Sequence, residues 1–106
     1  MTCKEFCEKT GGKILSGDEE RVLNGCYIGD LLSLAMSKVE ADNLWITIQS
    51  NINVVAVASL TDAGCVALCD GFTPDEDALK KAIDEDITIM TSDKSAYELA
   101  IAFFNN

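Results

Sequence analysis

Residues 44–69 decide the fold and read LWITIQSNINVVAVASLTDAGCVALC. Residues 44–48 are a short apolar run that predicts a buried strand, and residues 65–69 form a second run of the same kind. Residues 52–60 between them are also apolar, so the three segments follow one another with little polar sequence in between. We interpret the whole stretch as one strand–helix–strand unit.

The middle segment, Ile52 to Leu60, is rich in valine, and propensity alone favours a strand there. We predict a helix for two reasons. Ser50 or Asn51 can cap its first turn, and Gly64 can end it. The segment then spans about eleven residues, which is too long for an ordinary strand.

Downstream, the same alternation continues. Thr73 begins the sequence Thr73-Pro74-Asp75-Glu76, which has a capping-box pattern, a proline at the first helical position and acids in the first turn, and so predicts a helix. Its expected core face is formed by Ala78, Leu79, Ala82 and Ile83. The pattern next predicts a strand at residues 87–90 and a last helix that Ser92 or Asp93 can cap.

Upstream, the sequence predicts five shorter elements. Thr2 and Glu5 form a capping-box pattern ahead of the first helix, Gly11-Gly12 ends it, and Asp30 can cap the second helix. In chain order the elements are a helix from Cys3, a brief strand at residues 14–15, a charged turn at 18–21, a strand at 26–28 and a helix whose apolar face holds Leu31, Leu32, Ala35, Met36 and Val39.

Strands and helices therefore alternate at a spacing of about 20 residues from residue 44 onward, which implies right-handed crossovers and parallel strands. Near-continuous apolar strands are typical of a sheet that is covered on both faces. We expect an α/β fold, a three-layer α/β/α sandwich with a largely parallel central sheet of about four to five strands. A chain of 106 residues has the length of one domain, here residues 1–106.

The net charge of −10, from 18 acidic and 8 basic residues, limits the partners. An acidic surface repels phosphate backbones and anionic membrane surfaces, so we expect neither nucleic acid nor a membrane as a partner. The most apolar run, residues 44–60, is too short and too polar to span a bilayer, and no signal peptide is evident. These features predict a cytoplasmic protein.

The five cysteines are expected to be free thiols in a reducing compartment. Cys3 and Cys7, like Cys65 and Cys69, are four residues apart, which is not the spacing of redox or zinc motifs. At these spacings each pair can face the core together with its neighbours, where cysteine behaves as a small hydrophobe. We predict neither a metal nor another cofactor.

Catalytic machinery is not recognisable in the sequence. The chain has no histidine, which removes the commonest general base and excludes Ser-His and Cys-His nucleophiles. A phosphate-binding loop of the form G-x-x-x-x-G-K-[ST] is also missing. Its nearest approach, Gly12-Lys13, has Cys7 in place of the first glycine and Ile14 in place of the hydroxyl residue. We therefore expect no phosphotransfer.

Several stretches, in their order and spacing, resemble small stand-alone DRTGG domains. They are Gly25–Leu32, Leu44–Gln49, Leu68–Gly71 and Pro74–Glu76, and the resemblance covers essentially the whole chain. The family's namesake positions correspond to Glu20-Arg21, Thr47 and Asp70-Gly71, so two of the five differ. The resemblance implies an α/β/α sandwich similar to the N-terminal domain of HPr kinase/phosphorylase. It also implies a regulatory or accessory role, because relatives are fused to CBS domains in pyrophosphatases.

Three short polar loops follow the predicted parallel strands, and each leads into a helix. Ligands of open α/β sheets bind outside the carboxyl ends of the strands, and free amides at a helix start favour an anion. Helix capping alone explains Ser50, Thr73 and Ser92, but it does not require Gln49 or Asn53. The candidate ligand-binding residues are Gln49, Ser50, Asn51, Asn53, Asp70, Gly71, Thr73, Thr91, Ser92 and Asp93.

Two functions are favoured by the sequence, ahead of a third, an enzyme with an unfamiliar active site. The first is a non-catalytic regulatory or interaction domain that acts on an unidentified protein partner. The second is a sensor that binds a nucleotide or another small anion at the strand-end loops. We also expect a homodimer through the helix at residues 52–60, because that helix is apolar all round and needs cover on every side. The alternative is that the first helix or Phe103-Phe104 covers it.

Overall fold

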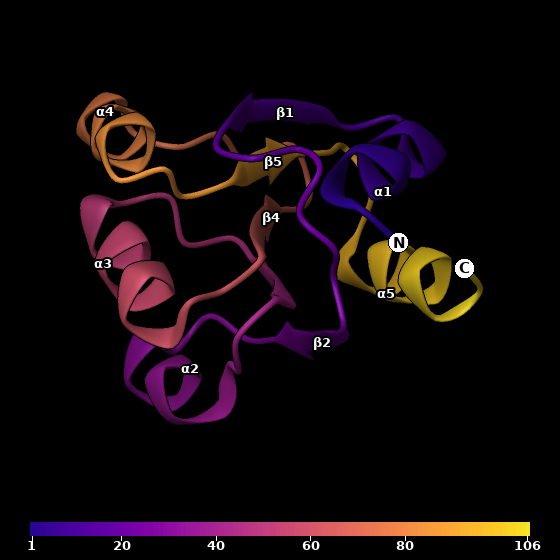
Figure 1. Cartoon of the computed structure of the whole chain (residues 1–106), viewed down its shortest axis with the longest axis horizontal. Coiled ribbons are helices and arrows are strands. Elements are labelled where there is room, and N and C mark those ends of the chain that lie inside the picture. The colour runs from indigo at the N-terminus through magenta and orange to yellow at the C-terminus, as the bar shows by residue number, and fades with distance from the viewer.

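A five-stranded sheet lies between two layers of helices in the computed structural model, which describes residues 1–106 (Figure 1). The elements in chain order are α1 (Cys3–Thr10), β1 (Lys13–Ser16), β2 (Gly25–Ile28), α2 (Leu32–Lys38), β3 (Asn43–Thr47), α3 (Ile52–Thr61), β4 (Cys65–Leu68), α4 (Glu76–Asp84), β5 (Ile89–Thr91) and α5 (Ala96–Phe104). Each predicted element is present. The predicted α/β sandwich is confirmed.

The strand order is β1-β5-β4-β3-β2, so the first two strands of the chain form the two edges. Strands β2, β3, β4 and β5 run parallel to one another. Only β1 is antiparallel: Lys13 lies opposite Thr91 and Ile14 opposite Met90. The expectation of a largely parallel sheet of about four to five strands is confirmed.

The two faces of the sheet carry separate cores. Helices α2, α3 and α4 lie on one face, where Trp45 and Val66 are completely buried (Figure 1). Helices α1 and α5 lie on the other face, where Phe6, Leu44 and Met90 are completely buried. Side chains alternate between the two faces along each strand, so successive residues of a strand belong to different cores. Three helices cover one core and two helices cover the other.

Residues 52–61 form the predicted helix α3 rather than a strand. The Asn51 side chain caps it by accepting a hydrogen bond from the backbone of Asn53 at 2.9 Å. Its end was wrongly predicted, because Asp62 and not Gly64 takes the left-handed conformation, with φ of 56°. Gly64 has a different role, since a Cβ there would come within 2.8 Å of the backbone of Asp42.

The four residues of α3 that face inward are Val54, Val55, Val57 and Ala58, each at most 4% exposed. They are covered by α2 and α4, which flank α3 on the same face of the sheet (Figure 1). The chain therefore covers most of this helix itself and leaves Leu60, at 73% exposed, as its open large apolar side chain. A dimer contact on this helix stays a prediction. The alternative was wrong, since α1 and Phe103-Phe104 lie on the opposite face.

Three helix starts differ from their predictions. Asp30 does not cap α2, whose N-cap is Leu31 with no side-chain bond. The α4 helix begins at Glu76, so Asp75 and not Thr73 is its N-cap. The α5 helix is capped by Ser95, in a reciprocal pair with Glu98, and not by Ser92 or Asp93. Each predicted cap lies one to three residues too early, because the helix begins later than the capping residue suggests.

The predicted core faces of α2 and α4 are only partly buried. On α2, Ala35 and Val39 are buried, whereas Leu31 and Met36 are 65% and 50% exposed. On α4, Ala78 and Ala82 are completely buried, but Ile83 is 58% exposed. Both helices lie at the sides of their layer and contact α3 on one flank only, so their outer apolar residues have no neighbour.

The expected start of α1 and the expected positions of the paired cysteines are confirmed. Thr2 and Glu5 exchange the two capping-box hydrogen bonds, and Gly11 ends the helix at a φ of 66°. Cys3 and Cys7 are buried around Phe6. Cys65 and Cys69 are buried in the same cluster, and only Cys26 is exposed.

Candidate functional site

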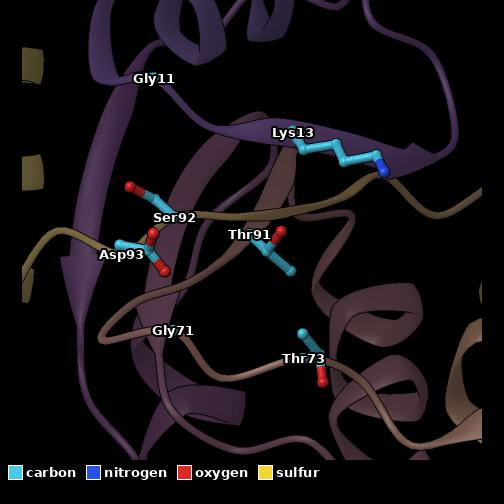
Figure 2. A pocket seen from close by; sticks show the side chains of 7 residues that line it. All are labelled: Gly11, Lys13, Gly71, Thr73, Thr91, Ser92 and Asp93. Carbon is cyan, nitrogen blue, oxygen red and sulfur yellow. The ribbon is translucent and has the colours of Figure 1, made fainter.

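A small polar cavity of about 180 Å³ lies at the carboxyl ends of β4 and β5 (Figure 2). Its wall comes from three parts of the chain: the segment between α1 and β1, the loop from β4 to α4, and the loop from β5 to α5. None of its residues is hydrophobic. They are Gly11, Lys13, Gly71, Thr73, Thr91, Ser92 and Asp93.

Five of these seven residues were candidates from the sequence: Gly71, Thr73, Thr91, Ser92 and Asp93. The structure brings them together because β4 and β5 are adjacent parallel strands, and their following loops leave the same edge of the sheet. Five of the candidates therefore lie around one cavity at this edge of the sheet.

Sequence reasoning missed Gly11 and Lys13. Lys13 was considered only as part of a failed phosphate loop. It reaches the cavity because β1 pairs antiparallel with β5, so that Lys13, at the start of β1, lies beside Thr91, at the end of β5. No local signal in the sequence indicates that pairing, since the two residues are 78 positions apart.

Main-chain hydrogen bonds hold the two strand-end loops together. The N–H of Asp70 donates to the carbonyl of Lys94 at 2.8 Å, and the N–H of Gly71 donates to the carbonyl of Ser92 at 3.0 Å. Asp70 and Gly71 both adopt positive φ, 55° and 78°, so the chain turns sharply here. A Cβ on residue 71 would lie 3.3 Å from the Asp93 carboxylate, which shows how closely Asp93 lies over Gly71.

Several donors around the cavity have no partner within the chain. The Lys13 ammonium forms no ion pair and no hydrogen bond, and the hydroxyls of Thr73 and Thr91 form none either. The main-chain N–H groups of Thr73 and Asp93 are also absent from the internal hydrogen bonds. These groups are free to bind something from solution.

The cavity also has an internal polarity. Lys13 and Asp93 extend on different sides of it with Thr91 between them, and the Asp93 carboxylate is directed inward (Figure 2). Asp93 accepts no hydrogen bond from the chain. A lysine and an aspartate without internal partners therefore both belong to the wall of this cavity, and the Lys13 side chain extends away from the Asp93 carboxylate (Figure 2).

The five remaining candidates do not line this cavity; they are Gln49, Ser50, Asn51, Asn53 and Asp70. Their polar atoms are mostly used by the fold. Gln49 donates its side-chain amide to the carbonyl of Asp30 at 2.7 Å, and Ser50 donates its hydroxyl to the carbonyl of Ile48 at 3.1 Å. Asn51 caps α3, and the side chain of Asn53 is exposed without a partner.

Asp30 organises this neighbouring loop. Its carboxylate accepts the hydroxyl of Thr47 at 2.8 Å and the N–H of Ile48 at 3.0 Å. These bonds connect the segment after β2 to the end of β3. Asp30 therefore serves as a structural anchor between two loops, which is why it is unavailable to cap α2.

Arg21, one of the positions compared with the DRTGG namesake residues, also has a structural role. Its guanidinium forms ion pairs with Asp42 at 2.8 Å and Asp62 at 2.9 Å, and it donates to the carbonyl of Asp62 as well. Both aspartates take left-handed turns, before β3 and after α3. Arg21 thus fastens the amino edge of the sheet, away from the polar cavity.

The fold has a solved counterpart. It is the crystal structure of the CBS and DRTGG domains of the regulatory region of Clostridium perfringens pyrophosphatase, complexed with the activator diadenosine tetraphosphate. The TM-score is 0.80 at 11% sequence identity, and the match covers 95% of this chain and 45% of that one. The present chain therefore shares its fold with part of a regulatory region and spans less than half of the solved chain.

The sequence itself matches no protein-family model and no curated protein. No group of three or more histidine, cysteine, aspartate or glutamate side chains is placed so that it could hold a metal ion. None of the helices has the length and the apolar content that crossing a bilayer requires. The polar cavity is therefore the feature on which a functional proposal can be based.

Proposed function

We propose that this chain is a non-catalytic regulatory domain of the DRTGG type that senses a small oxyanion, of the phosphate class, in the polar cavity. The shared fold with a region that contains DRTGG domains supports the first half of the proposal. Lys13, a wall residue of the cavity whose ammonium has no partner in the chain, supports the second half, and it is the observation that carries it.

The donors match the needs of a tetrahedral oxyanion. An ammonium supplies charge, while two hydroxyls and two main-chain N–H groups supply directed hydrogen bonds. Lys13 lies on one side, and Thr73 and Thr91 lie on the others (Figure 2). Because these groups have no hydrogen-bond partner within the chain, they can bind an anion without breaking an existing hydrogen bond.

The volume limits the size of the ligand. Pockets that enclose a drug-sized molecule measure about 300–1,000 Å³, whereas this one measures about 180 Å³. One phosphate-sized group fits, and a whole nucleotide would extend beyond the cavity. The activator bound to the pyrophosphatase regulatory region carries phosphates, which agrees with this ligand class.

Asp93 adds selectivity. A carboxylate repels an anion, so a bare phosphate would bind weakly, and a ligand with a hydroxyl or amine donor beside its phosphate would bind better. A phosphomonoester of a hydroxylated molecule has both groups. We expect the domain to pass the binding signal to a protein partner, since the matched region belongs to a larger regulated enzyme.

The test is ligand-dependent thermal stability. Phosphate at about ten times its Kd would stabilise the native state by ~1.4 kcal/mol, which raises Tm by roughly 5–10 °C for a domain of this size. Lys13→Met should abolish the shift. The matched control, Lys80→Met, replaces an exposed lysine on α4 outside the cavity and should leave the shift intact.

Asp93→Asn provides a second arm. Removing the carboxylate should strengthen the binding of inorganic phosphate and weaken the preference for phosphomonoesters such as AMP. Sodium chloride at matched ionic strength controls for general salt effects, which persist in Lys13→Met. If the Tm shift of Lys13→Met equals that of the unmodified chain, the cavity does not bind phosphate and the proposal is wrong.

A further inference from the structure

The face of the sheet that α1 and α5 cover has an uncovered margin along β2. Cys26 and Ile28 on this edge strand are both exposed, Ile28 to 49%. Their side chains line a groove together with Ala100 and Phe103 of α5. The next side chain along the strand, Tyr27, packs against the core on the opposite face.

Helix α5 presents further apolar side chains to solvent beside this margin. Tyr97 is 74% exposed, Ile101 40% and Phe104 86%. The spacing of four and three residues places them on one stripe of the helix. We define the α5–β2 surface by its apolar members, Cys26, Ile28, Tyr97, Ala100, Ile101, Phe103 and Phe104.

The groove in this surface measures about 620 Å³ and is lined by no charged residue. Phe104 forms part of its wall and is also the most exposed large apolar side chain of the molecule. A projecting aromatic ring and an apolar hollow therefore lie side by side.

The backbone of β2 adds a second feature. The strand ends the sheet, so the N–H and C=O groups along its outer side have no strand to pair with. Soluble proteins commonly protect such an edge with charged side chains, a proline or a bulge. The edge strand Gly25-Cys26-Tyr27-Ile28 has no charge and no proline, and its pairing with β3 is regular.

We propose that the α5–β2 surface binds a second copy of this chain in a two-fold dimer. In that dimer the β2 strands pair antiparallel, so that the two sheets continue into one. The Phe104 ring of each copy enters the groove of the other.

Self-complementarity points to a second copy rather than another protein. A two-fold contact brings the same patch of both subunits together, so a projection and a hollow on that patch fill one another. An antiparallel pair of identical strands satisfies the same symmetry. Both copies carry a charge of −10, and an uncharged surface is where two such copies can approach with the least repulsion.

The apolar area of the α5–β2 surface is of the order that a stable protein interface buries. An aromatic side chain buries about 150–250 Å² when it is fully covered, and both Tyr97 and Phe104 are largely exposed. A stable interface buries roughly 800 Å² on each partner. These two rings supply a large part of that area, and Ile28, Ile101 and the groove wall add to it.

The experiment is a mass measurement by light scattering at micromolar concentration. The unmodified chain should have twice the chain mass of 11.4 kDa. Phe104→Asp and, separately, Ile28→Lys should give the single-chain mass with an unchanged circular dichroism spectrum. The matched control, Leu60→Asp, replaces a side chain that is 73% exposed on α3, and it should remain dimeric.

Amide exchange of β2 gives a second measurement. Its outward N–H groups should be protected in the dimer and should lose at least tenfold in protection in Phe104→Asp. Tyr97→Asp replaces Phe104→Asp if the latter does not fold. A single-chain mass for the unmodified protein contradicts the proposal. A dimer that survives Phe104→Asp or Tyr97→Asp together with Ile28→Lys contradicts it equally, because the contact then lies elsewhere.

Discussion

Helices α3 and α5 have similar compositions and opposite surroundings. The first reads INVVAVASLT and the second AYELAIAFF, and neither has more than one charged residue. Four residues of α3 are buried, but in α5 only Leu99 is. The helix that was expected to need a partner has its cover within the chain, and the helix that lacks cover was not suspected.

The difference comes from position in the layer. Strand order places α3 in the middle of three helices, between α2 and α4, whereas α5 has only α1 beside it (Figure 1). A helix in the centre of a layer is enclosed by the sheet below and a neighbour on each side. Apolar composition therefore indicates that a helix must be covered, and only topology indicates what covers it.

The largest expected effect is that of a charge placed on each helix. Val55→Asp buries an unpaired carboxylate and should cost more than about 4 kcal/mol, a large share of the roughly 5–15 kcal/mol that holds a domain folded. Tyr97→Asp, on the exposed stripe, should change the free energy of unfolding of one chain by less than about 0.5 kcal/mol. Urea unfolding followed by the fluorescence of Trp45 measures both, at a protein concentration low enough for light scattering to give the single-chain mass. Equal losses would remove the contrast between the helices.

The next largest effect is the difference in stability between a buried and a partly exposed substitution on α5. Leu99→Ala removes a completely buried side chain and should cost about 2–5 kcal/mol. Ile101→Ala, two residues along, removes a side chain of equal size that is 40% exposed and should cost distinctly less. The same urea titration decides. A greater loss for Ile101→Ala would show that the outer stripe of α5 is already covered within one chain.

The smallest effect concerns acid. Hydrogen bonds from the backbone and side chain of Thr2 lower the pKa of Glu5, and those of Ser95 lower the pKa of Glu98 in the same way. Because the folded pKa values are lowered, this stabilisation is complete above the ordinary value near 4.5 and is lost as the pH falls below it. Both residues start helices of the α1–α5 face, whereas α3 contains no ionisable side chain.

Amide exchange at pH 5 and pH 3 can detect this difference. After correction for intrinsic rates, protection in α1 and α5 should fall at the lower pH while protection in α3 stays constant. Glu98→Gln should reduce the pH dependence of α5 and leave that of α1 unchanged. A uniform loss across all three helices would indicate that the acid effect is global and not tied to the two capping boxes.

The sequence predicts the elements well because their signals are local. Apolar runs, the capping pair Thr2 and Glu5 and the cap at Asn51 act within a few residues of themselves. Helix ends were less predictable, since Asp62 rather than a glycine ends α3 and Ser95 rather than Ser92 begins α5. Asp62 tolerates positive φ because a short polar side chain fits that conformation, so the helix ends without a glycine at that position.

The candidate site was predictable only where strand direction determines it. The carboxyl ends of β4 and β5 locate Gly71, Thr73 and Asp93, but the cation opposite them comes from β1. The loop after β3 is polar like its neighbours, yet the side chains of Gln49 and Ser50 already donate hydrogen bonds to main-chain carbonyl groups. Contacts between segments far apart in the chain decide which polar side chains keep unused hydrogen-bonding groups. Such contacts cannot be inferred from the neighbouring sequence.

The antiparallel pairing of β1 with β5 has a consequence for the order of folding. Residues 25–84 can assemble through successive strand–helix–strand contacts that are close in sequence, whereas Lys13 meets Thr91 only after a loop of 77 intervening residues has closed. We expect the β1–β5 contact to form late and to rate-limit the last stage. The polar cavity includes that contact, so the chain should be able to bind its ligand only at the end of folding. Ligand binding would then show that folding is complete.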